Sequence, residues 1–155
     1  MTALGTERIL VLAPVGRDAP ATADLLDKAN LQPHVCGSLD ALVDALVQGA
    51  AAAFVAEEAL FGRDLGRLLA WIAAQPVWSD LPFVVLTSRR HDLRVAAWRQ
   101  ALVRSLGNVS LVERPVHPIT LSSTLQAAVR ARHRQYEVRA LLEGEEAAGE
   151  VAREA

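Results

Sequence analysis

Polar side chains follow three apolar runs of the sequence within two residues. They are the carboxylates of Glu57 and Glu58, the hydroxyl of Thr87, and the guanidinium of Arg114, which Pro115 follows. If the three runs are parallel strands of one sheet, their carboxyl ends meet at one edge, where doubly wound sheets place their functional loops. Carboxylates accept hydrogen bonds, and a guanidinium binds a carboxylate through two parallel hydrogen bonds. The spacing therefore predicts a polar site built from these side chains.

Other residue types that carry chemistry are sparse. No two of the four histidines are spaced as metal ligands on one element; they are His34, His91, His117 and His133. The single cysteine, Cys36, excludes an intramolecular disulfide and a zinc site with several cysteines. The loop over residues 13–20 has one glycine and two prolines without an amide donor, so it does not match a phosphate-binding loop. We therefore expect no metal ion and no cofactor.

The length and the charge of the chain limit which classes of protein it can belong to. The chain has 155 residues, which corresponds to one domain of about 150 residues. Sixteen basic against eighteen acidic residues give a net charge of −2, which argues against a strongly basic nucleic-acid-binding module. Every apolar run is shorter than the roughly 20 residues of a membrane-spanning helix, and the N-terminus lacks a signal-peptide pattern. We expect a cytoplasmic domain with no membrane span and no nucleic-acid partner.

Apolar runs and helical patterns alternate along the chain. The runs lie at residues 8–14, 34–36, 52–56, 83–86 and 109–112, and the helical patterns at 19–31, 39–48, 64–75, 92–105 and 119–142. Solidly apolar strands that alternate with helices predict a parallel sheet covered on both faces. Ser38 is the predicted N-cap of the second helix and Gly49 its C-terminal stop. The fold class is α/β, a doubly wound five-stranded parallel sheet with an extended C-terminal helix.

Four segments, in their order and spacing, resemble the receiver domain of two-component response regulators. They are ILVL (residues 9–12), FVAEE (54–58), residues 78–88 and LVERP (111–115). The resemblance covers about residues 7–130 and implies a flavodoxin-like, receiver-type fold. Residues 78–88 and 132–142 are also similar to the receiver-like N-terminal segment of certain bacterial sensor histidine kinases. This similarity implies a histidine kinase as partner, in cis or in trans.

Receivers transfer a phosphoryl group from a phosphohistidine to an aspartate. An acidic pair after the first strand and the acceptor aspartate after the third hold magnesium, which prefers oxygen ligands. This sequence departs from that pattern. Ala13 and Pro14 stand where the acidic pair is expected, and neither side chain can ligate magnesium. Glu57 matches the acceptor position, with Glu58 one residue beyond it.

The residues that follow the predicted fourth and fifth strands match the receiver pattern in part. Thr87 matches the hydroxyl that senses the phosphoryl group, while Arg114 replaces the family's lysine and is followed by Pro115. Because a guanidinium presents a fixed fork of donors, we hypothesise a permanent Glu57–Arg114 pair. The alternative is that both glutamates form a solvated loop pair and Arg114 points to water.

We therefore interpret residues 1–130 as a degenerate receiver, or pseudo-receiver. This non-enzymatic signalling domain has kept the fold and lost the metal-dependent phosphoacceptor site. Two alternatives stay open: an atypical phosphoacceptor that uses Glu57 or Asp18, and a small-ligand sensor at the strand ends.

The last helix is longer than the helix of a receiver, which ends near residue 130. We expect residues 131–155 to project as a helix and linker. A weak heptad seam of Val129, His133, Tyr136 and Ala140 predicts a parallel homodimer through this helix. The alternative is that the helix folds back on its own domain or frays after Tyr136.

The helix over residues 92–105 is rich in arginine, and Arg94 lies one turn before Trp98. Arginine and tryptophan dominate the energetics of protein interfaces, so this pair predicts a partner surface. The alternative is that Trp98 covers the edge of the core and the arginines are solvated.

Overall fold

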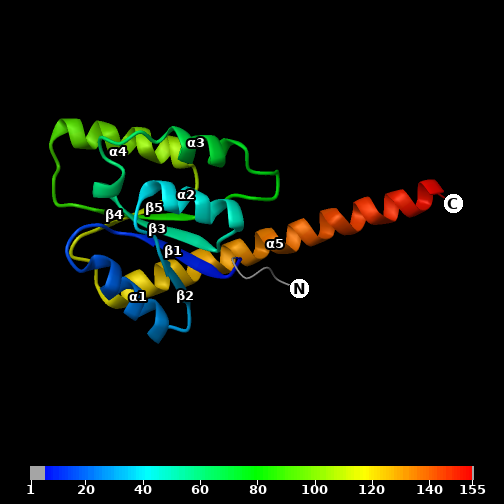
Figure 1. Ribbon diagram of the computed structural model, residues 1–155, viewed down its shortest axis with the longest axis horizontal. Coiled ribbons are helices and arrows are strands. Elements are labelled where there is room, and N and C mark those ends of the chain that lie inside the picture. The colour runs from blue at the N-terminus through cyan, green and yellow to red at the C-terminus, as the bar shows by residue number, and fades with distance from the viewer. Residues whose placement is uncertain (1–5, 155) are drawn as a thin grey trace.

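The computed structural model describes residues 6–154 and contains a five-stranded parallel sheet flanked by helices (Figure 1). The strands are β1 (Arg8–Leu12), β2 (Gln32–Val35), β3 (Ala52–Ala56), β4 (Phe83–Thr87) and β5 (Val109–Glu113). The helices are α1 (Asp18–Lys28), α2 (Leu39–Gln48), the 3₁₀ helix η1 (Glu57–Ala59), α3 (Gly66–Ala73), α4 (Leu93–Leu106) and α5 (Pro118–Glu154). The strand order β2-β1-β3-β4-β5 confirms the predicted doubly wound sheet.

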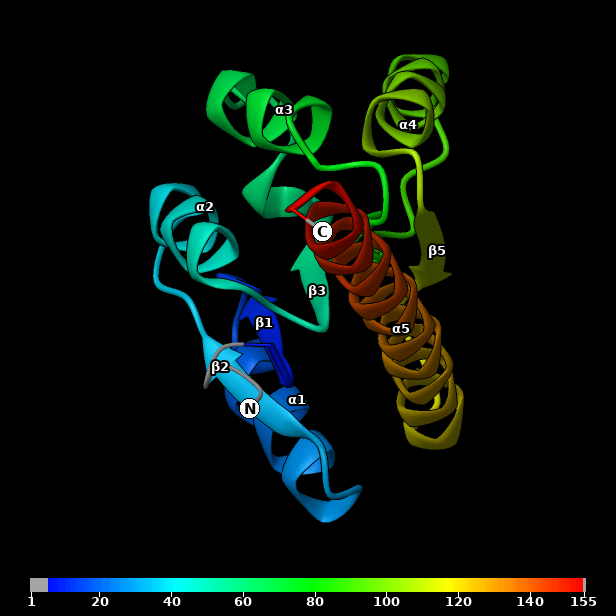
Figure 2. The ribbon, with the colours of Figure 1, turned by 90° about the vertical axis from the view of Figure 1, so that its right-hand side faces the viewer.

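Alternate residues of the central strands point to opposite faces of the sheet, and each face has its own core. On one face, Leu10 and Val55 pack with residues of α2, α3 and α4. On the other face, Val11 and Phe54 pack with residues of α1 and α5. Figures 1 and 2 show these two helical layers with the sheet between them. Because both faces are covered, the strands are continuously apolar instead of alternating with polar residues.

Side-chain caps fix where two helices begin. The hydroxyl of Ser38 accepts the N–H of Ala41 at 3.0 Å, and Gly49 ends α2 with a φ of 115°, so both predictions for this helix are confirmed. The carboxylate of Asp92 caps α4 by accepting the N–H of Val95 at 3.0 Å. This hydrogen bond is the main reason that the pKa of Asp92 is lowered.

The last helix, α5, has 37 residues and is about 55 Å long at 1.5 Å per residue. Its first turns pack on the sheet through Leu121, Leu125 and Val129. Contacts with the domain continue to Arg139, which stacks over the ring of Trp78, so the boundary at residue 130 falls inside the packed part of the helix. Beyond this point α5 projects from the domain (Figure 1). No helix in the described part of the chain is long and apolar enough to cross a membrane.

Candidate functional site

Glu57 lies at the carboxyl end of β3, where η1 begins, and it is held by Arg99 of α4. The carboxylate accepts hydrogen bonds from Nη2 of Arg99 at 2.9 and 3.0 Å and from its Nε at 3.2 Å. Arg99 also donates to the backbone carbonyls of Arg90 and Ser88. The pair is almost removed from solvent, with side-chain exposures of 11% for Arg99 and 6% for Glu57. Glu57 therefore ties α4 and the β4–α4 loop to the end of β3.

The hypothesised Glu57–Arg114 pair is wrong. Consecutive residues of a 3₁₀ helix are about 120° apart, because such a helix has about three residues per turn. Glu57 and Glu58 of η1 therefore point to different sides. Glu57 points to Arg99 on α4, whereas Glu58 points to Arg114 after β5.

Arg114 bridges two carboxylates from different elements. Its Nη1 donates to both carboxylate oxygens of Glu58, at 3.0 Å to Oε2, and its Nη2 donates to Oδ2 of Asp18, the first residue of α1, at 2.7 Å. Burial by itself would lower the pKa of Arg114, but the hydrogen bonds with Glu58 and Asp18 outweigh it and raise the pKa above the usual value. Arg114 is therefore a permanent cation between two acidic side chains.

The end of β1 offers no metal ligand. Ala13 is buried and Pro14 is exposed, and neither side chain carries an oxygen or nitrogen that could coordinate a cation. Over residues 6–149, whose side chains the structure describes, no group of three His, Cys, Asp or Glu side chains could hold a metal ion. Pro115 follows Arg114 through a cis peptide bond. The cation beside the carboxylates at this edge of the sheet is a guanidinium of the chain itself.

The hydroxyl that contacts Glu57 belongs to Ser88 and not to Thr87. Thr87 ends β4, and its hydroxyl donates to the carbonyl of Val112 on β5 at 3.5 Å. The backbone N–H of Ser88 donates to Oε2 of Glu57 at 3.1 Å, and its hydroxyl donates to Oε1 at 3.4 Å. The loop after β4 thus touches the Glu57 carboxylate, one residue later than expected.

Three of the four residues of the predicted dimer seam face their own domain. Val129 is buried in the core between α5 and the sheet. The hydroxyl of Tyr136 lies 2.8 and 2.9 Å from two backbone carbonyl oxygens of the domain, and Nε2 of His133 lies 2.7 Å from a carboxylate oxygen of Glu7. Only Ala140 is exposed within this set of residues. Within one chain α5 thus uses this face to bind its own domain, and the dimer through the seam stays a prediction.

Arg132 is a structural residue of α5 that the sequence analysis missed. It is 3% exposed and donates from Nε to the carbonyl of Ala50 at 3.1 Å and from Nη1 to the hydroxyl of Ser79 at 2.8 Å. Its guanidinium carbon lies 5.3 Å from the ring centre of Trp78 and 5.0 Å from that of Tyr136. None of the described carboxylates forms an ion pair with it. Burial without a counter-charge lowers the pKa of Arg132.

Trp98 covers the edge of the core instead of presenting a free ring. It is half-buried and makes an edge-to-face contact with Phe61, with ring centres 5.0 Å apart. Arg94 is exposed, and its guanidinium carbon lies 5.8 Å from the same Phe61 ring. Arg94 is the more exposed of the two residues, and the partner surface at this pair stays a prediction.

A groove of about 580 Å³ lies between α1 and α5, next to Arg114. Leu25, Val116 and Leu121 line it with apolar surface, and Lys28 contributes a charge. This volume is in the range of small-molecule pockets, which span about 300–1,000 Å³.

Comparisons with solved structures show which known proteins share this fold. No protein-family profile and no curated protein matches the sequence. A response regulator receiver domain protein from Clostridium thermocellum matches with a TM-score of 0.63 and 12% identity, over 81% of this chain and 96% of that one. Full-length FixJ from B. japonicum matches with a TM-score of 0.64 and 22% identity, over 89% of this chain and 64% of the longer one.

A further solved structure with a similar fold is named as an enzyme and not as a receiver domain. It is the adenylate cyclase from Rhodopirellula baltica, with a TM-score of 0.64 and 12% identity, over 89% of this chain and 98% of that one. At these identities the likenesses concern the fold. The chain has the fold of response-regulator receiver domains, with a long last helix.

Proposed function

We propose that the chain is a pseudo-receiver, a non-enzymatic signal-transduction module in which arginines permanently occupy the former acceptor site. The observation that carries the proposal is that each carboxylate of the site is bound by a guanidinium. Glu57 is bound by Arg99, while Glu58 and Asp18 share Arg114.

These contacts disfavour transfer of a phosphoryl group to Glu57. Transfer to a carboxylate needs an accessible oxygen and cations that neutralise the phosphoryl charge. Both oxygens of Glu57 are engaged by Arg99 and Ser88, and the side chain is buried. Arg114 is tethered to the chain and cannot exchange for magnesium. We infer a domain with one fixed arrangement of the β4–α4 loop and α4, which a linked or partner histidine kinase binds without phosphorylation.

Acetyl phosphate and magnesium test this proposal. After incubation, intact-mass spectrometry should find the 155-residue chain without a phosphate adduct, beside an active receiver domain that is labelled under the same conditions. A stable single adduct would overturn the proposal and favour the atypical phosphoacceptor. The variants Glu57→Gln and Asp18→Asn would then identify the acceptor, because only the variant without it loses the adduct.

We further propose that the chain forms a homodimer through the part of α5 that leaves the domain. Leu141, which follows Arg139, is 68% exposed, and Val138, one residue before Arg139, is 45% exposed on a side of α5 outside the face that binds the domain. Exposed apolar side chains on a projecting helix favour association with another protein surface.

Small-ligand sensing is a second candidate function, favoured by the α1–α5 groove. The apolar dye ANS should bind there with a saturable rise in fluorescence. Ala21→Trp would fill the groove and abolish the rise, whereas Ala127→Trp, on an exposed position of α5 outside the groove lining, would leave it unchanged. Equal dye binding by both variants would exclude the groove as a ligand site.

A further inference from the structure

The side of α5 that faces away from the domain carries a regular row of side chains. Tyr136 marks the bound side, because its hydroxyl contacts two backbone carbonyls of the domain. Arg134 and Val138 are each two residues away from Tyr136, which is slightly more than half a turn of about 3.6 residues. Leu141 and Glu145 follow Tyr136 by about 1.4 and 2.5 turns. All four therefore lie on the side of α5 opposite to Tyr136.

Two alanines extend this row at its ends. The row, here called the outer seam, consists of Ala131, Arg134, Val138, Leu141, Glu145 and Ala148. Its members are separated by 3, 4, 3, 4 and 3 residues, which is the spacing along the contact line of a coiled coil. Val138 and Leu141 are 45% and 68% exposed, and Arg134 and Glu145 are exposed as well. Neither charged side chain forms an ion pair within the described part of the chain.

The outer seam is complementary to itself when its direction is reversed. An antiparallel pair of helices has a two-fold axis across the helices, which here passes between residues 139 and 140. About this axis, Val138 of one copy lies opposite Leu141 of the other. Arg134 lies opposite Glu145 in the same way, and the two alanines of the seam lie opposite each other. Apolar, charged and small positions thus each meet a suitable partner.

We propose that two copies of the chain pair antiparallel through the outer seam. The inference rests on the proposed function, because it names the residues and the direction of the proposed homodimer. The two-fold axis repeats every contact, so an Arg134–Glu145 ion pair lies on each side of a central apolar cluster. The paired stretch from residue 131 to residue 148 is about 27 Å long at 1.5 Å per residue.

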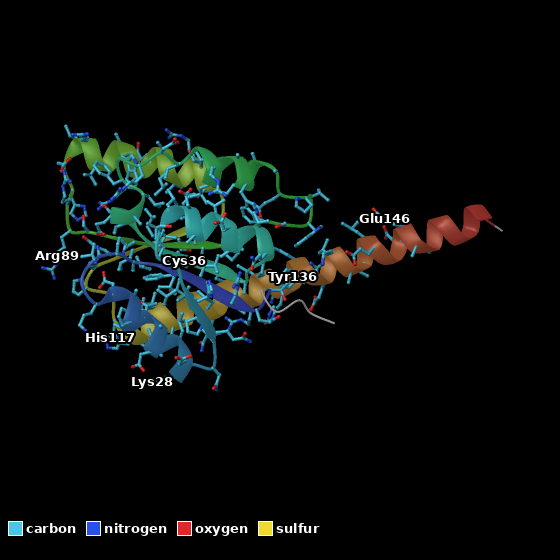
Figure 3. The ribbon with its side chains drawn as sticks, in the orientation of Figure 1. Lys28, Cys36, Arg89, His117, Tyr136 and Glu146 are labelled. Carbon is cyan, nitrogen blue, oxygen red and sulfur yellow. The ribbon has the colours of Figure 1, made fainter. Side chains whose placement is uncertain are left out.

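The position of the domain on α5 is compatible with this pairing. Each domain binds the side of its own helix that is opposite to the outer seam, so the two domains lie on the outer sides of the helix pair. Figure 3 shows Tyr136 where α5 still lies beside the domain and Glu146 on the part that projects. In the pair, the projecting half of one outer seam covers the half of the other seam that lies beside its domain.

Charge determines the direction of the pair. In a parallel pair in register, Arg134 would lie opposite Arg134 of the second copy, and Glu145 would lie opposite Glu145. Like charges placed against each other in an interface repel, and neither side chain would gain a counter-charge. The antiparallel pair removes both repulsions and forms two ion pairs. The outer seam therefore favours a direction opposite to that of the parallel dimer predicted from the sequence.

A charge-exchange experiment with the full chain distinguishes the two directions. Sedimentation equilibrium measures the dissociation constant of the dimer for the wild type, Arg134→Glu, Glu145→Arg and the double variant. In the antiparallel pair each single change creates two like-charge contacts, so it should weaken the dimer by about tenfold or more, and the double variant should recover most of the affinity. In a parallel pair a single change only replaces one like-charge contact by another.

The matched control is Glu143→Arg, which has the same net charge as Glu145→Arg. Glu143 is exposed and follows Tyr136 by about two turns, so it lies on the side of α5 away from the outer seam. This variant should dimerise like the wild type. Circular dichroism of each variant checks that a lost dimer is not a lost fold.

Four results would overturn the antiparallel pairing: a monomeric wild type, a dimer that Arg134→Glu leaves unchanged, a double variant no tighter than the single variants, or a control weakened as much as Glu145→Arg. The proposed function fails on different results. A dimer that ignores both charge reversals keeps the homodimer and loses only its antiparallel seam. A phosphate adduct would remove the pseudo-receiver and leave the pairing intact.

Discussion

Replacing Arg99 with methionine should lower the free energy of unfolding by about 3–5 kcal/mol, because it leaves the carboxylate of Glu57 buried without a cation. The wild-type pair is nearly free of solvent, so water cannot replace the guanidinium. The carbonyls of Arg90 and Ser88 lose a donor at the same time. Urea denaturation of the full chain at neutral pH, followed by circular dichroism, measures the loss.

A paired variant separates the buried charge from general damage to α4. Glu57→Leu/Arg99→Met removes both charges and should recover at least half of the lost stability, because apolar side chains of similar volume replace buried ion pairs at little cost. Arg94→Met, on an exposed position of the same helix, should change stability by no more than about 0.5 kcal/mol. If Arg99→Met costs no more than Arg94→Met, the Glu57–Arg99 pair does not stabilise the domain.

Replacing Arg132 with methionine should loosen the part of α5 that follows Val129 and cost about 2–4 kcal/mol. The change removes the buried guanidinium donors to the Ala50 carbonyl and the Ser79 hydroxyl, which keep only Tyr136 and Gln75 as hydrogen-bond partners. It also removes the cation that stacks on Trp78. Because burial penalises the charge of Arg132, as its lowered pKa indicates, the loss is smaller than the sum of these contacts.

Amide hydrogen exchange shows which part of α5 is loosened by Arg132→Met. Amides of residues 130–140 should exchange faster in the Arg132→Met variant, while the central strands β1, β3 and β4 keep their protection. The matched control is Arg130→Met, an exposed position on the same helix, for which exchange should match the wild type. Unchanged protection of residues 130–140 in Arg132→Met would show that other contacts hold the helix.

The order of strands and helices could be predicted because it depends on local patterns. Runs such as residues 52–56 and 83–86 are apolar without alternation, and the structure buries them between two layers of helices. Helix ends were less predictable where a single side chain decides them. The carboxylate of Asp64 accepts the N–H of Gly66 at 2.9 Å, and α3 begins at Gly66 and not at residue 64.

Which arginine binds which carboxylate depends on how the helices pack, so the sequence alone does not determine these pairs. The positions of two arginines on their helices do, however, indicate that both side chains are buried. Arg99 is spaced four and three residues from the buried Val95 and Leu102, so it lies on the core side of α4. Arg132 continues the buried stripe of α5 three residues after Val129. An arginine at a core-facing position needs a buried partner, and this requirement predicts a polar contact inside the domain. Which partner it finds follows only from the packing of the helices.

Because α5 is one continuous helix from the sheet to Glu154, the direction in which each of its side chains points around the helix axis is fixed relative to the domain. Each residue of an α-helix turns the chain by about 100° and advances it by 1.5 Å, so the direction of Glu145 is defined relative to Arg132. One residue inserted between them would swing the glutamates about a quarter of the way around the helix, whereas about seven inserted residues would return them nearly to their original side. The number of residues between Arg132 and Glu145 therefore decides which side of α5 the exposed glutamates occupy, whatever the identity of the residues between them.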